Sequence, residues 1–162
     1  MDSTSPHNGT QDTIAAIATA WGEAGIAIVR LSGPDARRLA DRQLVLTVPL
    51  SGTPPRYLRN GFLLDEKGEA IDQVLAVWFA SPKSYTGEEV VEIHTHGGTL
   101  VAQKCLELLL CRGARLAEPG EFTKRAFLSG RIDLTQAEAV LGIIRSRSDE
   151  ALRAAARTLK GE

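Results

Sequence analysis

Arg30 is a charged residue inside a segment that otherwise has the pattern of an apolar β-strand. It shares one face of that strand with Ile26 and Ile28, and the opposite face is apolar as well. A guanidinium in such a place needs a partner, because a buried charge without one is costly. Two interpretations stay open: the side chain reaches solvent past the end of the strand, or it anchors an anion or another ligand.

Glu92 raises the same question on a later strand, where it shares a face with Val90 and His94. One interpretation is a solvated outer face, since antiparallel sheets can leave one face in water. The other is a carboxylate directed into a cleft. There its two oxygens could accept hydrogen bonds from the flat, amidine-like edge of a ligand.

His94 and His96 have the spacing of a metal-binding pair. Residues two apart point the same way only while a strand continues, and Gly97 and Gly98 predict that it ends here. The remaining histidine, His7, lies near the amino terminus, and neither cysteine is close in sequence. Without a third ligand, metal binding is the weaker interpretation.

Three polar segments outside the strands could also contribute to a site. Ser84 to Glu89 carries hydroxyls and a glycine, and Glu118 to Arg125 holds more polar groups than a helix start requires. Arg131 and Asp133 connect two predicted helices, where a side chain can reach a cleft without disturbing the core. An ordinary turn, capping with solvated charge, and a surface salt bridge are the alternatives.

The composition and the missing motifs limit the function. The sequence has neither a Gly-x-x-x-x-Gly-Lys-Ser/Thr phosphate loop nor a Gly-x-Gly-x-x-Gly motif after a strand, so this chain alone is not expected to hydrolyse GTP. Its 19 Lys and Arg against 20 Asp and Glu give no overall field that attracts RNA, so any RNA contact must be local. No apolar run approaches the ~18 residues of a membrane span. The expectation is a cytoplasmic protein without a membrane segment, disulfide or metal site.

The periodicity predicts an α+β fold, a two-layer α/β sandwich with a mixed or antiparallel sheet of about five strands. The strand segments are Thr13 to Thr19, Ile26 to Ser32, Tyr57 to Asp65, Ile71 to Ala80 and Glu89 to His94. Turn residues predict hairpins between the first two segments and between the third and fourth. A short helix is expected from Pro34 to about Leu46.

The second half of the chain has helical periodicity. The predicted helices are Gly98 to Gly113, Glu121 to Leu128, one capped by Thr135 with Glu138 that runs at least to Arg147, and Ser148 to Lys160 with an apolar stripe. Residues 1–11 are polar and are expected to form a disordered leader. The expected division is an α/β domain over residues 12–130 and the beginning of a helical domain over 131–162.

Six stretches together resemble the family of bacterial tRNA modification GTPases called MnmE or TrmE. They span almost the whole chain in the family's order, and are Asp12 to Ala16, Gly25 to Gly33, Ser84 to Glu88, Glu92 to Gly98, Glu118 to Leu128 and Arg131 to Ala139. Where the family commonly has a proline and a glycine-rich loop with arginine, this chain has Trp21-Gly22-Glu23-Ala24-Gly25.

The resemblance implies an N-terminal domain similar to the tetrahydrofolate-binding domains of aminomethyltransferase-like proteins. Such a domain binds 5-formyl- or methylene-tetrahydrofolate, forms a homodimer, and supplies a one-carbon unit for modification of the tRNA wobble uridine. The family works with a flavoprotein partner, MnmG (GidA). The resemblance places GTP, Mg²⁺ and K⁺ binding in a GTPase domain that this chain lacks.

The same resemblance places the folate contacts on Arg30, Glu92 and Arg131. Glu92 could accept two hydrogen bonds from the pterin edge, and the arginines could hold a formyl oxygen or the anionic glutamate tail. No catalytic residue is expected. Two alternatives stay open: a dimerisation scaffold that makes no use of folate, and a stand-alone one-carbon transferase.

Overall fold

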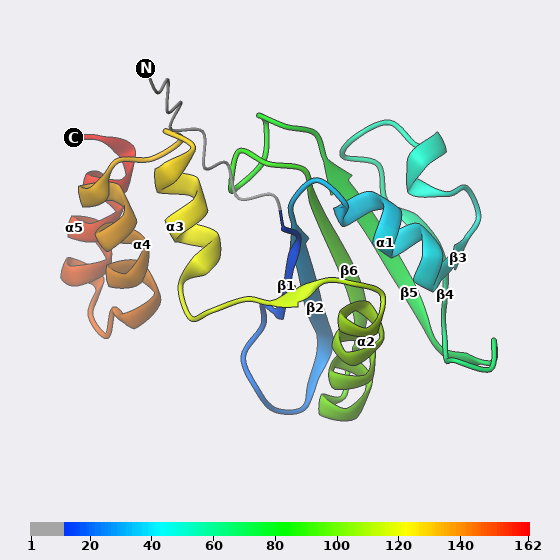
Figure 1. Cartoon of the computed structure of the whole chain (residues 1–162). Coiled ribbons are helices and arrows are strands. Elements are labelled where there is room, and N and C mark those ends of the chain that lie inside the picture. Colours follow the sequence, from blue (N-terminus) through cyan, green and yellow to red (C-terminus); the bar gives the residue numbers. More distant parts are fainter. Residues whose placement is uncertain (1–11) are drawn as a thin grey trace, which may run out of the picture.

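A seven-stranded mixed sheet forms the centre of the protein within residues 12–162, which are those that the computed structural model describes (Figure 1). The leader expected over residues 1–11 lies outside them. The elements are β1 (Ile14–Ile17), β2 (Ala24–Ser32), α1 (Ala36–Gln43), β3 (Leu44–Leu46), the 3₁₀ turn η1 (Leu50–Gly52), β4 (Arg59–Leu64), β5 (Ala70–Phe79), β6 (Val90–Gly97), α2 (Thr99–Cys111), β7 (Arg115–Leu116), α3 (Glu121–Leu128), α4 (Leu134–Arg145) and α5 (Asp149–Lys160).

The sheet has the strand order β3-β4-β5-β6-β2-β1-β7. Every neighbouring pair is antiparallel except β1 with β7. This confirms the mixed α+β fold and both predicted hairpins, β1 with β2 and β4 with β5. The expected number of strands was wrong, because the edge strands β3 and β7 are only three and two residues long, and β7 pairs with β1 at the other end of the α/β part of the chain.

The first helix ends at Gln43 instead of continuing to Leu46. The next residues form β3, in which Leu44 lies opposite Leu63 of β4 and is buried in the core. Pairing with β4 gives the backbone a ladder of hydrogen bonds, so tertiary contacts override the local tendency to continue the helix.

The hydrophobic core lies between one face of the sheet and helices α1 and α2 (Figure 1). Val29, Ile93 and Ala76 contribute from the central strands, and Leu39 and Leu109 from the two helices. The opposite face carries Arg30 and Glu92, and Phe122 of α3 lies over Arg30. Strands β2 and β6 therefore have one apolar face in the core and one face with charged side chains, as the alternation of their sequences requires.

Strand β6 runs through Gly97 and does not end after His94, as the two glycines had suggested. Gly97 is paired with Ala24, and a Cβ at this position would lie 1.9 Å from the Ala24 carbonyl oxygen. This glycine therefore permits close approach to β2 and extends the strand. As a result His96 faces the same side of the sheet as His94 and Glu92.

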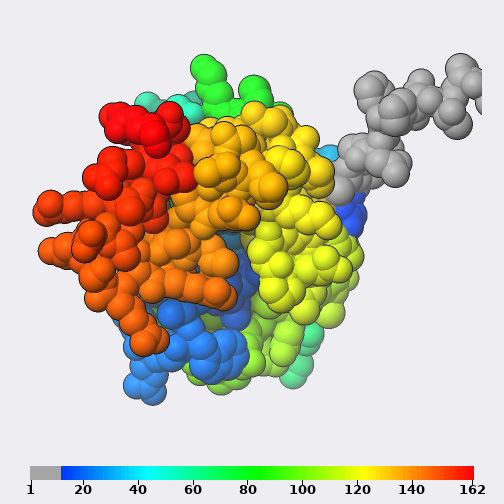
Figure 2. All heavy atoms as spheres, turned by 90° about the vertical axis from the view of Figure 1, so that its left-hand side faces the viewer, coloured from blue at the N-terminus to red at the C-terminus, as the bar shows by residue number. Residues whose placement is uncertain are grey.

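Helices α4 and α5 form a hairpin next to α3, on the side of the molecule away from β3 (Figure 1). Figure 2 shows α3, α4 and α5 as one continuous surface. The Gln136 side chain near the start of α4 donates to the Leu159 carbonyl near the end of α5 (3.0 Å), so the helices run in opposite directions. The division of the chain at residue 130 stays a prediction.

The cap of α4 differs from the predicted one. Asp133, not Thr135, is the N-cap: its Oδ1 accepts from the Gln136 backbone N–H (2.7 Å), and Gln136 Oε1 accepts from the Asp133 N–H (3.0 Å). The helix ends at Arg145 rather than Arg147. An aspartate with a glutamine three residues later makes the same reciprocal cap as the predicted threonine with glutamate.

Candidate functional site

Arg30 and Glu92 form an ion pair across the junction of β2 and β6. They are register partners, and Arg30 Nη2 and Nε donate to Glu92 Oε1 at 2.8 and 3.1 Å. Their side chains are 25% and 17% exposed, so neither extends freely into solvent. Each of the two charges was expected to need a partner. In the structure Arg30 and Glu92 are the partners of each other.

Only one of the two carboxylate oxygens of Glu92 is engaged by Arg30. The other, Oε2, lies 3.5 Å from His94 Nε2. That nitrogen is buried and has no hydrogen-bond partner in the described part of the chain. Glu92 Oε2 and His94 Nε2 therefore face each other, and Oε2 is the oxygen of Glu92 to which Arg30 does not donate.

Two aromatic rings cover Arg30 from different elements. The guanidinium carbon lies 5.3 Å from the centre of the Tyr85 ring and 5.6 Å from that of Phe122 on α3. Both distances are within the range of cation–π attraction. The Tyr85 hydroxyl also makes a 2.8 Å hydrogen bond with Thr123 Oγ1, which joins the loop before β6 to α3 over the ion pair.

Arg131 reaches the same loop from the connection between α3 and α4. Its Nε donates to the Tyr85 carbonyl oxygen at 3.1 Å, and its side chain is exposed. All three residues of the predicted site therefore converge around Tyr85. Arg131 contacts this loop, while Arg30 pairs with Glu92 beneath the Tyr85 ring.

The loop over residues 84–89 is more tightly held than an ordinary turn. Ser32 Oγ on β2 lies 2.6 Å from Glu88 Oε2 and 2.7 Å from Thr86 Oγ1, and Ser129 Oγ donates to the Thr86 carbonyl at 2.7 Å. Gly87 has φ +80°, and a Cβ there would approach Ser129 Oγ to 2.6 Å. Its hydroxyls and glycine thus fix the position of Tyr85.

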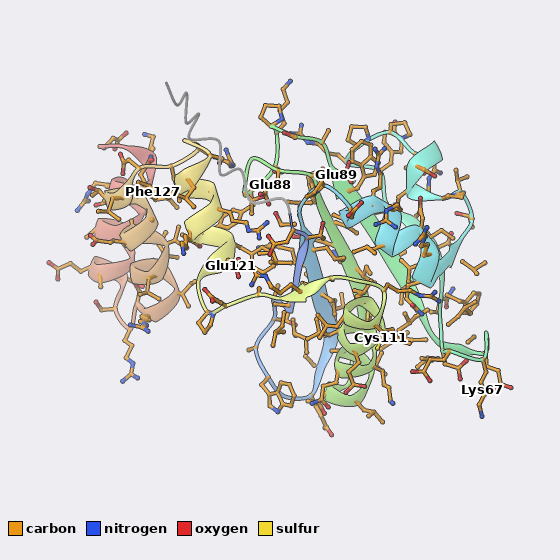
Figure 3. The ribbon with its side chains drawn as sticks, in the orientation of Figure 1. Lys67, Glu88, Glu89, Cys111, Glu121 and Phe127 are labelled. Atoms are coloured by element: carbon orange, nitrogen blue, oxygen red, sulfur yellow. The ribbon has the colours of Figure 1, made fainter. Side chains whose placement is uncertain are left out.

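A buried charge network lies between α3 and the sheet, where Figure 3 labels two of its carboxylates, Glu88 and Glu121. Arg125, 3% exposed, donates through Nη2 to Asp12 Oδ1 (2.7 Å) and through Nη1 to Glu88 Oε2 (3.1 Å), and it also contacts Glu121. Arg115 of β7 bonds to Asp12 and to Glu121. The network ties α3 to β1, β7 and the loop that carries Tyr85.

The arginines of this network lower the pKa values of two of its carboxylates. Hydrogen bonding from Arg115 lowers the pKa of Glu121 from 4.5 to about 2, against the opposing effect of burial. The pKa of Asp12 is lowered as well, mainly by its hydrogen bond with Arg115. Both groups therefore stay ionised at neutral pH and hold α3 in place.

The sequence indicated only part of this network. The density of polar residues from Glu118 to Arg125 was the available signal, and helix capping with solvated charge was the alternative. The structure shows burial instead of solvation. The partners were not predictable by spacing, because Asp12 and Arg125 are 113 residues apart in the chain.

An open cavity of about 320 Å³ lies on the same face of the sheet, and His94, which is 3.5 Å from Glu92, is one of its lining residues. Ile26, Leu75, His94 and His96 are among the side chains that line it. In the β2–β6 register His94 lies opposite Ile28, the next pair on this face after Arg30 and Glu92. The candidate site thus consists of an ion pair under two aromatic rings and an adjoining cavity with two imidazoles.

Among residues 12–162, no group of three or more His, Cys, Asp or Glu side chains is arranged to hold a metal ion. Cys105 is buried, which raises the pKa of its thiol to about 12, and Cys111 is exposed. Over the same residues, none of the helices is both long and apolar enough to cross a membrane.

Comparison with known proteins gives the family. The model of the family described as the N-terminus of the GTP-binding protein TrmE matches residues 13–131, a range that contains Arg30, Glu92 and Arg131. Two relatives named tRNA modification GTPase MnmE, from Syntrophobacter fumaroxidans and Carboxydothermus hydrogenoformans, are 51% and 52% identical over 154 and 155 residues. A third of the same name, from Thermotoga maritima, is 51% identical over 150 residues.

These alignments cover 93 to 94% of this chain but 32 to 34% of the relatives. The chain therefore spans about one third of the length of the relatives that it matches. Since the family model covers most of the sheet and all three residues of the predicted site, and half of the aligned residues are identical to those of the relatives, the chain belongs to the MnmE (TrmE) family and matches its N-terminal region.

Proposed function

We propose that this chain binds a reduced folate, 5-formyl- or methylene-tetrahydrofolate, as the dimer-forming N-terminal domain of a tRNA modification protein. The observation that carries the proposal is the half-buried pair of Arg30 and Glu92 beneath Tyr85 and Phe122. A charged pair and two aromatic rings suit a flat heterocycle with donors on one edge and acceptors on another.

Glu92 is suited to recognise the pterin edge. That edge presents an amino group and a ring N–H side by side, and an ionised carboxylate can accept from both. One oxygen of Glu92 is already without an arginine donor, and the other is held by Arg30. Binding through both oxygens releases the Arg30 guanidinium, which can then donate to a carbonyl or formyl oxygen of the same ligand.

Arg131 is suited to the other end of a folate. It is exposed and fixed to the Tyr85 carbonyl through Nε alone, so its terminal nitrogens can reach a ligand. A guanidinium pairs well with a carboxylate such as those of the glutamate tail. We assign Glu92 to the pterin, Arg30 to the one-carbon substituent, and Arg131 to the tail.

The role in tRNA modification rests on the relatives, which carry that function in their name. In this proposal the folate supplies a one-carbon unit for the wobble uridine. The alignment covers about one third of the length of such a relative, and we assign GTP hydrolysis with Mg²⁺ and K⁺, tRNA contacts and the flavoprotein partner MnmG to proteins of the relatives' full length.

Calorimetric titration with 5-formyltetrahydrofolate tests the folate site. We expect saturable binding that Glu92→Ala and Arg30→Ala each weaken by at least about tenfold, since a hydrogen bond to a charged group contributes ~1.5–3 kcal/mol. Arg131→Ala should cause a smaller loss, because its side chain is exposed. Glu107→Ala, an exposed carboxylate on α2, is the matched control and should bind as the unaltered chain does.

The outcome separates the rival functions. A folded, dimeric chain without folate affinity would overturn the folate proposal and favour the dimerisation scaffold. Turnover of folate with an acceptor and no added domain would favour the stand-alone one-carbon transferase. Binding that survives both Glu92→Ala and Arg30→Ala would place the folate elsewhere on the molecule.

A further inference from the structure

Two connections of the chain lie side by side at one end of the sheet. Residues 53–58 lead from η1 into β4, and residues 80–89 lead from β5 into β6 (Figure 1). Strands β4 and β5 are antiparallel, and Arg59 at the start of β4 lies opposite Ala76 near the end of β5. The connection before β4 is therefore next to the connection after β5.

Arg56 joins these two connections. Its backbone N–H donates to the Trp78 carbonyl oxygen of β5 at 2.8 Å, and its Nη2 donates to the Lys83 carbonyl oxygen at 3.3 Å. Both Arg56 and Lys83 are exposed, and so is the ring of Tyr57. Arg56, Tyr57 and Lys83 together form one surface, which we call the basic patch.

The charge of the basic patch is not neutralised by neighbouring carboxylates. No Asp or Glu occurs in residues 42–64 or in residues 73–87. Glu88 and Glu89, which follow, are each paired with an arginine outside the patch. Among residues 12–162, the two cations of the patch make no ion pair. A chain with a net charge of -1 thus carries a local positive surface.

The backbone of Arg56 supports a role for its side chain. Its φ is +68°, the one positive φ of a non-glycine residue among residues 12–162. This left-handed conformation is unfavourable for residues with a Cβ, and glycine, asparagine and aspartate are its usual occupants. An exposed arginine adds nothing to the core that would offset the strain. We infer that a function of the guanidinium at the surface is the reason for it.

A ring beside cations is suited to single-stranded RNA. The phosphates of RNA attract lysine and arginine, and unpaired bases stack on exposed aromatic rings. Tyr57 is 59% exposed, so a base can reach its face. An acidic protein segment would use the two cations but not the ring.

The basic patch adjoins the candidate site. Lys83 precedes Tyr85 by two residues, so their Cα atoms are at most ~7 Å apart. The centre of the Tyr85 ring lies 5.3 Å from the guanidinium carbon of Arg30. An RNA strand on the basic patch is therefore close to the proposed folate.

We propose that the basic patch binds a single-stranded segment of RNA next to the folate site. Arg56 and Lys83 contact phosphates, and Tyr57 stacks on a base. The inference rests on the proposed role in tRNA modification. The contact is local, since the net charge of the chain gives no overall attraction for RNA.

Fluorescence anisotropy on the whole 162-residue chain tests the basic patch. The probe is a labelled RNA hairpin with the anticodon stem and loop of a tRNA and uridine at the wobble position. We expect a dissociation constant of about 10⁻⁴–10⁻⁶ M. Arg56→Gly and Lys83→Gln should each make the slope of log affinity against log salt smaller by about 0.7, because each removes one phosphate contact. Glycine adopts a positive φ without strain, so Arg56→Gly keeps the fold.

Tyr57→Ala tests the stacked base separately. The affinity should fall by about fivefold or more, while the salt slope stays unchanged, because the ring carries no charge. Lys104→Gln is the matched control. It removes one cation from α2, where Lys104 is paired with Glu107 (3.8 Å), and it should change neither the affinity nor the slope.

The proposal is overturned if the unaltered chain at about 10⁻³ M binds no RNA. It is also overturned if the patch variants bind as the unaltered chain does, or if Lys104→Gln loses as much affinity as they do. Competition by polyglutamate as strong as that by unlabelled RNA would make an acidic protein the partner instead. Failure of the proposed function is distinguishable, because calorimetry measures folate binding without RNA, and Arg56→Gly should retain the folate affinity of the unaltered chain.

Discussion

Arg125 connects three carboxylates that lie far apart in the sequence. It is almost wholly buried, yet it contacts the side chains of Asp12, Glu88 and Glu121. Its contacts connect α3 with the first strand and with the loop that carries Tyr85. Arg125 thus lies outside the proposed ligand site but supports the helix from which Phe122 covers Arg30.

Replacement of this arginine should be strongly destabilising. Arg125→Met removes the buried cation that contacts all three carboxylates, although Arg115 still contacts Asp12 and Glu121. Removal of one partner from a buried ion pair costs about 3 kcal/mol or more. Urea denaturation followed by circular dichroism measures the loss. The control is Arg153→Met on exposed α5, which should remain within ~0.5 kcal/mol. Equal unfolding midpoints for both variants would contradict the importance of the network.

The same network predicts how stability depends on pH. The pKa of Glu121 is about 2 in the folded chain and 4.5 without its partners, so the unfolded chain binds the proton first as the pH falls. Its contribution is complete above pH 4.5 and is lost progressively toward pH 2. Thermal unfolding between these values should show a steep decline that Glu121→Gln makes shallower, and parallel curves for the two proteins would refute this assignment.

At the scale of elements, β6 shows what sequence periodicity could and could not predict. Alternation placed Glu92 and His94 on one face, and the structure confirms it. The prediction that the strand ends at His94 was wrong, because two consecutive glycines are typical of a turn. Gly97 is instead required by β2, which lies too close for a side chain.

Gly97→Ala should therefore destabilise the sheet. Its Cβ would meet backbone atoms of Ala24, which cannot move without disrupting the pairing of β2 with β6, and overpacking of this kind costs ~1–3 kcal/mol. Gly98→Ala is a close control, because the nearest atom to its Cβ is 3.9 Å away and its φ is −77°. Chemical denaturation should separate the two variants clearly, and equal stability would show that the strands can part here at little cost.

For the whole molecule, the exposed apolar residues on the face of the sheet opposite α1 and α2 are the main surface to explain. Ile26, Leu75 and Phe62 are 59%, 42% and 46% exposed there, beside the candidate site. Further exposed apolar residues lie on the hairpin of α4 and α5, including Leu134 and Ile144. Apolar surface of this extent is typical of protein interfaces, which agrees with the proposed dimer.

Light scattering at tens of micromolar tests the dimer. We expect twice the mass of the chain, and Leu75→Glu should shift the equilibrium toward monomer, because a charge on the buried side of an interface lacks a partner. Leu100→Glu is the control, as Leu100 is 66% exposed on α2 at the other side of the sheet. A monomeric unaltered chain would count against the dimer, and equal effects of both variants would place its interface elsewhere.

Local patterns were sufficient for the α+β class, both hairpins, the helices α2, α3 and α5, and the faces of β2 and β6. Periodicity and turn residues act between near neighbours, so the sequence itself carries this information. The residue types also singled out Arg30 and Glu92, because a charge inside an apolar strand is costly and needs a reason.

Only the tertiary structure decided which distant groups meet. It paired Arg30 with Glu92, 62 residues apart, and brought Arg131 to the loop above them. It also created β3 and β7, and it joined Asp72 of β5 to His96 of β6 beyond their last register pair, Leu75 with His94. Such contacts depend on strand order and on close approach of backbones, and neither is encoded in the spacing of residues along a single element.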